Sequence, residues 1–200
     1  MTSTSLFPAA DDDTRQAILR AAYDALCEHG YADLSTQRIA DASPKSKSLI
    51  YHHYDDKDDL LLDLLDHLLE RFQTETRADA DDPREHVQEV LDHVLAVELP
   101  PERRAFTRAM VSLRAQAAYD DDYREHFDRH DDVVHDRLRD AIAAGRDAGA
   151  FRDVDPDRVA SLLSTTIAGA TTRRVTGSED AVPAVRAELQ RYVEECLLAD

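Results

Sequence analysis

The hydrophobic and polar positions of this chain follow a helical pattern along most of its length. The clearest example is the stripe Leu60, Leu61, Leu64, Leu65 and Leu68, whereas the strict alternation of a half-buried strand is absent. The pattern predicts an all-α protein of about nine helices. We expect them over residues 14–29, 36–42, 47–53, 57 to beyond 71, 84–99, 102–119, 122–149, 156–175 and 182–198.

Local start and stop signals set the ends of several of these helices. Asp13 is a cap for the first, with Gly30 just past its end, because glycine tolerates the backbone turn that closes a helix. Ser35 and Ser46 are positioned to cap the next two short helices. The pair 155–156, an Asp followed by Pro, is a clean start for the eighth.

The charge of the chain is strongly negative, with one local exception. The net charge is −18, from 42 acidic residues, 30 of them Asp, against 24 basic residues of which only three are Lys. Such a balance resembles proteins of halophilic microbes, where concentrated salt screens self-repulsion. All three lysines, Lys45, Lys47 and Lys57, lie within 13 residues, and the stretch 35–54 carries a net +2. A locally basic segment on an acidic body indicates an anionic partner at that segment.

Composition also excludes several classes of protein. No apolar run reaches 18 residues, so a membrane span is not expected, and the first 13 residues show no secretory signal. The two cysteines, Cys27 and Cys196, form neither a disulfide framework nor a Cys-x-x-Cys metal pair. We therefore expect a cytoplasmic protein without a cofactor and without a membrane partner.

Residues 31–61 carry the most informative pattern, two short helices separated by a tight turn. In a helix-turn-helix the second helix enters the DNA major groove. Ile39 and Ala40 supply a small apolar contact for close packing, and Leu49, Ile50 and Tyr54 anchor the recognition helix. The Ser46 cap leaves the start of that helix facing outward, where phosphate oxygens can approach it.

This block resembles the N-terminal signature of the TetR (tetracycline-repressor) family without a gap over about 25 positions. The resemblance runs through Thr36, Ile39-Ala40, Leu49 to Tyr54, Lys57 and Leu60. Pro44 stands where the family has its turn glycine, and Ser48 replaces a glycine of the recognition helix. Because proline cannot adopt a positive φ, the turn is expected to differ slightly from the family's.

The resemblance implies a homodimeric transcriptional repressor that binds double-stranded DNA at a palindromic operator and is released by a small-molecule effector. Its two recognition helices would lie about 34–36 Å apart. Thr36, Tyr51, His53 and Lys57 match positions that contact phosphates or support the motif, while Gln37, Lys47, Ser48 and His52 face the groove. Lys47 suits guanine and Gln37 suits adenine. The full expected DNA-binding set is Thr36, Gln37, Arg38, Lys45, Ser46, Lys47, Ser48, Tyr51, His52, His53 and Lys57.

In the family, the helices beyond the DNA-binding domain bind the effector and form the dimer. We therefore divide the chain into a tail (1–12), a helix-turn-helix domain (13–56) and an effector-binding and dimerisation domain (57–200). Candidate effector-pocket residues are Phe106, Met110, Leu113, Tyr123 and Phe127. Candidate dimer-interface residues are Ser161, Thr165, Ala168, Gly169, Thr172, Leu189 and Val193. For both sets the alternative is ordinary core packing within one chain.

Two other functions compete with the regulator hypothesis. His126 and His130 are four residues apart and share a helical face. Such a pair can bind a metal ion, so a helical metal-dependent enzyme is one alternative. We nevertheless expect no metal site. The chain lacks a phosphate-binding glycine loop, a nucleophile elbow and a His-Glu-x-x-His motif, so we do not expect an enzyme. The second alternative is a helical interaction protein that does not bind DNA.

Overall fold

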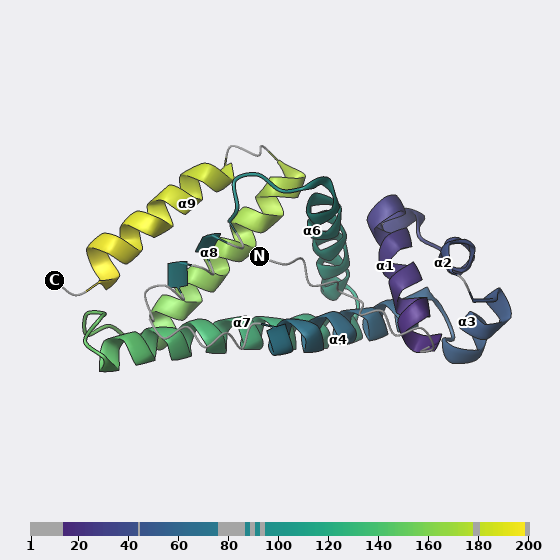
Figure 1. Cartoon of the computed structure of the whole chain (residues 1–200), viewed down its shortest axis with the longest axis horizontal. Helices are drawn as coiled ribbons and strands as arrows, with labels where there is room; N and C mark the ends of the chain where they lie inside the picture. Colours follow the sequence, from purple (N-terminus) through teal and green to yellow (C-terminus); the bar gives the residue numbers. More distant parts are fainter. Residues whose placement is uncertain are drawn as a thin grey trace. The chain divides into compact units, whose positions relative to one another are not determined.

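The structure is a computed structural model that describes residues 14–43, 45–75, 87–88, 91–92, 95–177 and 181–198. These residues form eight α-helices, which confirms the predicted all-α class (Figure 1). In chain order the helices are α1 (Thr14–Asp33), α2 (Thr36–Ala42), α3 (Lys47–His53), α4 (Lys57–Glu75), α6 (Pro101–Arg114), α7 (Asp121–Asp147), α8 (Pro156–Thr176) and α9 (Ala181–Tyr192). A 3₁₀ turn follows α6 at Ala115–Ala118, and a π-helical turn follows α9 at Val193–Leu197.

The described residues belong to two compact units. The first comprises those within 1–77 and 108–127, and the second those within 78–107 and 128–200. In the first unit α2 packs against α1 and α3 against α2, and α4 also packs on α1 (Figure 1). In the second unit α9 packs on α8. The proposed helix-turn-helix segment therefore lies wholly inside the first unit.

The core of the first unit is built from the predicted helical stripes. The predicted leucine stripe of α4 is buried at its first four positions, and Leu68 packs against them. A fully buried leucine stabilises the fold by about 1.5–3 kcal/mol, so this stripe alone anchors α4 firmly. The partners of the stripe come from α1, α2 and α3, namely Ile18, Leu19, Ala22, Leu26, Ile39 and Ile50.

Gly30 breaks α1 where the sequence predicts its end. Its φ of 73° and ψ of 167° are not helical, and a positive φ of this size favours glycine. One further turn, 31–33, follows the break before Ser35 caps α2. The glycine thus sets the direction in which the chain leaves α1 toward the candidate DNA-binding helices.

The second unit has its own core and its own local signals. Asp155 caps α8, accepting hydrogen bonds from the backbone N–H of Asp157 at 3.1 Å and of Arg158 at 3.4 Å. Phe151 packs so closely on α7 that a Cβ added at Gly145 would overlap its ring. The core of this unit contains Leu138, Ile142, Phe151, Leu163, Ile167, Val182, Leu189, Val193 and Leu197.

Three predicted helix ends are wrong. The helices expected to end at 119 and 198 end at Arg114 and Tyr192, where a 3₁₀ turn and a π-helical turn take over. The helix expected over 84–99 does not reach its predicted end, because residues 95–100 are not helical, and its described helical residues are 87–88 and 91–92. Leu95 makes the last helical hydrogen bond, from its N–H to the carbonyl of Leu91 at 2.8 Å. Two prolines follow at 100–101. A proline disfavours the helical conformation of the residue before it, which is Leu99 here. No helix among the described residues is long and apolar enough to span a membrane.

Candidate nucleic-acid interface

Two capped short helices form the predicted helix-turn-helix. The Ser35 hydroxyl accepts from the N–H of Arg38 at 3.3 Å and caps α2, and Ser46 accepts from the N–H of Leu49 at 3.4 Å and caps α3. Both caps are confirmed. Pro44, which we expected to alter the turn, lies outside the described residues.

The apolar side of this motif fixes which side of α3 faces outward. Ile39 of α2 and Ile50 of α3 have no exposed surface, and Tyr54, directly after α3, is 8% exposed. Leu49 is partly buried. Because Ile50 points into the core, the side chains on the opposite side of α3 must face solvent.

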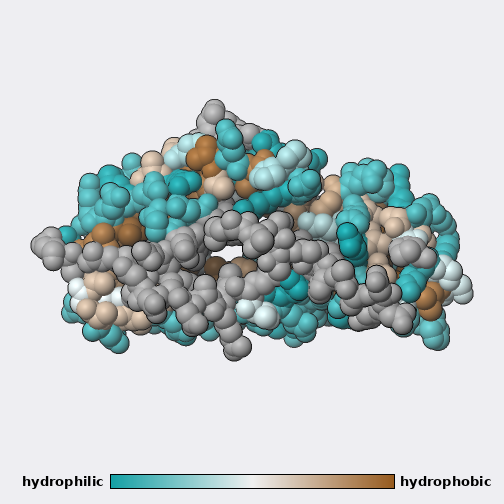
Figure 2. Space-filling model, in the orientation of Figure 1, coloured by the Kyte–Doolittle hydropathy of each residue, from teal (hydrophilic) through white to brown (hydrophobic). Residues whose placement is uncertain are grey.

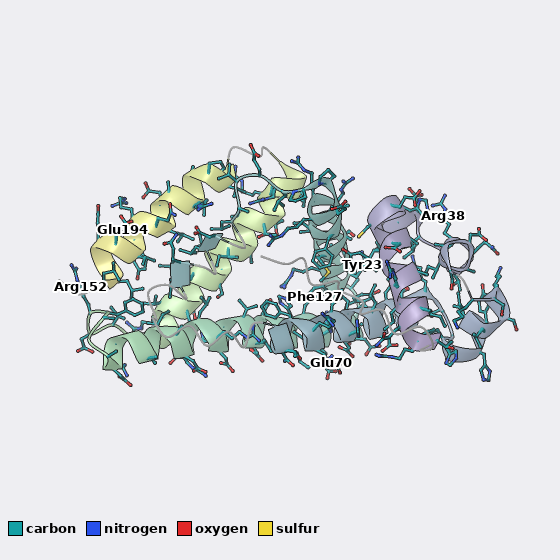
Figure 3. All side chains as sticks on the ribbon, viewed as in Figure 1. Tyr23, Arg38, Glu70, Phe127, Arg152 and Glu194 are labelled. Carbon is teal, nitrogen blue, oxygen red and sulfur yellow. The ribbon has the colours of Figure 1, made fainter. Side chains whose placement is uncertain are left out.

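The expected DNA-binding residues are mainly exposed. Thr36 and Lys45 are partly buried and Tyr51 is 51% exposed. The other exposed members, on or next to α2 and α3, are Gln37, Arg38, Ser46, Lys47, Ser48, His52 and His53. Arg38, labelled in Figure 3, belongs to α2 and donates a hydrogen bond to the backbone carbonyl of Asp33. The structure therefore brings this polar, locally basic set together on two adjacent helices.

A side-chain hydrogen bond connects α2 and α3, and a second one continues it along α2. The Lys47 ammonium donates to Oε1 of Gln37, and Nε2 of Gln37 donates to Oδ1 of Asp41 at 2.6 Å. The same ammonium lies 5.5 Å from the centroid of the Tyr51 ring. Asp41 is not among the residues predicted from the sequence, although its spacing of four residues from Gln37 on a helix is a signal for such a contact.

Lys57 differs in its surroundings from the other expected DNA-binding residues. Its ammonium donates to the backbone carbonyl of Tyr31 at 3.4 Å and lies 4.0 Å from the centroid of the Tyr31 ring. The Tyr31 hydroxyl in turn donates to Oδ1 of Asp58 at 3.0 Å, as does the Tyr123 hydroxyl at 2.9 Å. Burial, followed by the bond to Asp58, raises the pKa of Tyr31 to about 12. In this structure Lys57 therefore joins the start of α4 to the end of α1.

A second polar junction lies behind α3 and involves a residue that the sequence analysis missed. Asp63 of α4 accepts hydrogen bonds from Arg15 of α1 and from the Tyr54 hydroxyl, the latter at 2.5 Å. Burial, and then the hydrogen bond to Asp63, raises the pKa of Tyr54. An isolated Asp on an amphipathic helix gives no sequence signal for such a role.

Comparison with known proteins agrees with this geometry. Residues 18–64 match the family described as bacterial regulatory proteins, tetR family, and residues 83–198 match the BetI-type transcriptional repressor C-terminal family. The chain belongs to the TetR family. It is a DNA-binding transcriptional repressor of this family and is not an enzyme.

Individual TetR relatives extend this agreement over most of the chain. A TetR transcription regulator from Haloarcula marismortui is 37% identical, with a TM-score of 0.83 over 92% of this chain and 97% of that one. The repressor AcnR of Corynebacterium efficiens is 29% identical over 83% of this chain and 84% of its own. A regulator from Saccharomonospora viridis, solved in complex with choline, shares the fold at 22% identity, with a TM-score of 0.76 over 93% of this chain and 98% of that one.

The residues that we expected to line a TetR effector pocket are mostly packed in cores. Leu113, Tyr123 and Phe127 are buried in the core of the first unit, Met110 packs against that core, and Phe106 is partly buried. The Arg114 guanidinium of α6 lies 4.6 Å from the centroid of the Phe127 ring of α7 (Phe127 is labelled in Figure 3). A small cavity in the second unit is lined by other residues, Val97, Leu99, Arg104, Arg174 and Val182.

The expected TetR dimer residues divide into two groups. Those on α8, namely Ser161, Thr165, Ala168, Gly169 and Thr172, are exposed. Leu189 and Val193, by contrast, are buried in the core of their own chain, so they offer little surface to a second chain. The sequence cannot distinguish the two cases, because an apolar stripe has the same spacing whether its partner is the same chain or another. Leu162, which we did not select, is 47% exposed on α8.

His126 and His130 have separate partners. Nδ1 of His126, a buried residue, lies 2.8 Å from Oδ1 of Asp66, and Nδ1 of His130 lies 3.2 Å from Oδ1 of Asp131. Within the part of the chain that is described, no three His, Cys, Asp or Glu side chains gather as a metal site would require. Both histidines are therefore explained by ordinary polar contacts.

Proposed function

We propose that this TetR-family repressor binds a palindromic operator as a homodimer and is released by a small-molecule effector. The observation that carries the proposal is the exposed polar side of the capped helix α3, held outward by the buried side chains of Ile50 and Tyr54. Phosphate contacts supply register and affinity, while side chains in the groove select the sequence. The DNA-contacting set is the predicted one, with Lys57 supporting the motif through Tyr31.

The first experiment is selection of genomic DNA fragments by the purified protein in concentrated KCl. Enrichment of one inverted repeat supports the proposal. The variant Lys47→Ala/Tyr51→Ala should lose this enrichment, because both side chains belong to the proposed DNA-contacting set. It should remain folded, because both side chains are exposed. The matched control is Arg124→Ala/Tyr119→Ala, which removes an exposed Arg and an exposed Tyr from outside α2, α3 and α8 and should bind as the wild type does. Equal binding by both double variants would refute the assignment of the interface.

The exposed side of α8 is the proposed dimer surface. A Cβ added at Gly169 meets no atom within 4 Å in the single chain, so Gly169→Leu should leave the protomer folded. The same side chain would obstruct a helix packed closely against α8 from a second chain. We expect this variant to be a folded monomer with weakened operator binding. A Gly169→Leu protein that remains dimeric in analytical ultracentrifugation would contradict this surface.

The division into a tail (1–12), a helix-turn-helix domain (13–56) and an effector-binding and dimerisation domain (57–200) remains part of the proposal. The tail lies outside the described residues. The effector would bind within 57–200, where Phe106 is the candidate that is partly buried in the second unit. Phe106→Ala should weaken the response to whichever metabolite releases the operator, with operator affinity unchanged. An unchanged response would remove Phe106 from the pocket. A DNA target would place the protein in the cytoplasm.

The acidic composition supports a halophilic source, and the Haloarcula relative agrees with it. The coloured residues on the face in Figure 2 are mainly hydrophilic. A net charge of −18 repels DNA, and high salt weakens the counterion release that drives binding. We expect specific binding to persist in molar KCl through base contacts and shape. Loss of specific binding above modest salt, with the dimer intact, would contradict this expectation.

A further inference from the structure

The Gln37 side chain is held on two sides in the free protein. The amide oxygen of Gln37 accepts a hydrogen bond from the Lys47 ammonium of α3, and Nε2 donates to Oδ1 of Asp41 at 2.6 Å on the next turn of α2. All three side chains are exposed, so the contacts lie on the surface that would meet DNA. A long glutamine side chain is thereby restrained before any base is contacted.

The chemistry of the two neighbours fixes which way the Gln37 amide faces. An ammonium only donates and a carboxylate only accepts, so the amide oxygen must face Lys47 and the amide nitrogen must face Asp41. A primary amide has two N–H donors and two oxygen lone pairs. With one of each used, one donor and one acceptor remain. One donor and one acceptor are what N7 and the N6 amino group of adenine require.

Asp41 is unfavourable for DNA affinity in general. It is the sole acidic residue between positions 35 and 54, a stretch that otherwise carries Arg38, Lys45 and Lys47. A carboxylate beside phosphates repels them, so its removal should strengthen non-specific binding. Asp41 would lower the affinity for DNA of any sequence. Its presence at this position is explained if it increases the discrimination between bases.

We propose that Asp41 is a positioning residue that, together with Lys47, presents the Gln37 amide as an adenine reader in each half-site. This inference rests on the proposed operator binding. Asp41 does not contact the base, because its carboxylate acts through Gln37. Lys47 keeps further N–H donors for a neighbouring guanine, so the two residues read the site as a coupled pair.

The test is selection from a random-sequence DNA library by the full-length protein, with the preference at each base position compared between variants. Asp41→Ala removes the contact to Gln37, whereas Asp41→Asn removes the charge and keeps an acceptor oxygen. Asp33→Ala is the charge-matched control, since Asp33 is also exposed and lies in the same unit. The double variant Gln37→Ala/Asp41→Ala shows whether Asp41 acts through Gln37.

Asp41→Ala should lower the preference for adenine at one position per half-site about tenfold, within the range of a bidentate base contact. Its affinity for random DNA should be unchanged or higher. Asp41→Asn and Asp33→Ala should keep the wild-type preference, and Asp41→Ala should have no added effect on preference once Gln37 is alanine.

An Asp41→Ala protein with wild-type preferences at every position, or with a uniform loss at all positions, would overturn the inference while operator binding stands. An Asp41→Asn protein that loses the preference would overturn it as well. A wild-type protein that enriches no sequence would overturn the proposed function, and the inference with it.

Discussion

Asp63 offers the sharpest test of how the recognition helix is held. Its Oδ2 accepts from Nε of Arg15 at 3.0 Å and from the Tyr54 hydroxyl at 2.5 Å, and its Oδ1 accepts a second bond from Arg15 at 2.5 Å. Since Tyr54 directly follows α3, this carboxylate ties the end of the recognition helix to α1 and α4. Asp63→Asn keeps the shape of the side chain and removes its charge.

The two contacts of Asp63 contribute unequally to stability. The side chains of Arg15 and Asp63 are 45% and 26% exposed, and an exposed ion pair is worth about 0.5 kcal/mol. A hydrogen bond to a charged group is worth about 1.5–3 kcal/mol, and asparagine retains part of it because its oxygen still accepts from Tyr54. Together these terms predict that Asp63→Asn lowers the free energy of unfolding by about 1–2 kcal/mol near neutral pH.

The pH dependence follows from the pKa of Asp63. Burial acts to raise this pKa, but the hydrogen bonds from Arg15 and Tyr54 and the Arg15 charge outweigh it, and the pKa is lowered overall. A carboxyl whose pKa is lower in the folded than in the unfolded state stabilises the fold above its unfolded pKa of about 3.9. That contribution is lost as the pH falls through the folded pKa, so the difference between wild type and Asp63→Asn should shrink there.

The assay is urea unfolding followed by circular dichroism, at neutral pH and at a series of acidic pH values in one salt concentration. Asp153→Asn serves as the control, because Asp153 is exposed and its substitution removes the same charge. An Asp63→Asn protein that unfolds at the same urea concentration as this control at neutral pH would refute the reasoning. So would a difference from wild type that stays constant into strong acid.

Gly145→Ala should destabilise the chain by about 1–3 kcal/mol, because its methyl group overlaps the Phe151 ring. Ala144→Ser, at an exposed position of the same helix, should cost only about 0.5 kcal/mol, and equal thermal denaturation midpoints for the two variants would contradict the packing. Ser46→Ala removes the cap of α3 and should cost about 1 kcal/mol in urea unfolding, with weaker operator binding; no change in either would argue against the cap. The pKa of Tyr31 is about 12 in the folded protein and ordinarily 10.0. The protonated Tyr31 hydroxyl therefore stabilises the fold fully below pH 10.0, and this stabilisation is lost as the pH rises from there to about 12. Tyr31→Phe should therefore lose less stability than wild type in alkaline urea titrations, and an equal loss would contradict that pKa.

Features that depend on neighbours in the chain are readable from the sequence. The caps at Ser35, Ser46 and Asp155 and the break at Gly30 are each set by one side chain and the few backbone groups beside it, so their positions follow from residue type. The apolar stripe of α4 is likewise a local periodicity. These signals located the helix-turn-helix and supported the family resemblance.

Contacts between residues far apart in the sequence were decided only by the tertiary structure. Lys57 matches a DNA-contacting position by sequence, yet its ammonium is placed against Tyr31, 26 residues away. Leu189 and Val193 have the spacing of an interface and are buried within their own chain. Asp63 shows no sequence signal and still joins three segments. A one-dimensional pattern records that a side chain is apolar or charged, whereas its partner is chosen by how the helices pack in three dimensions.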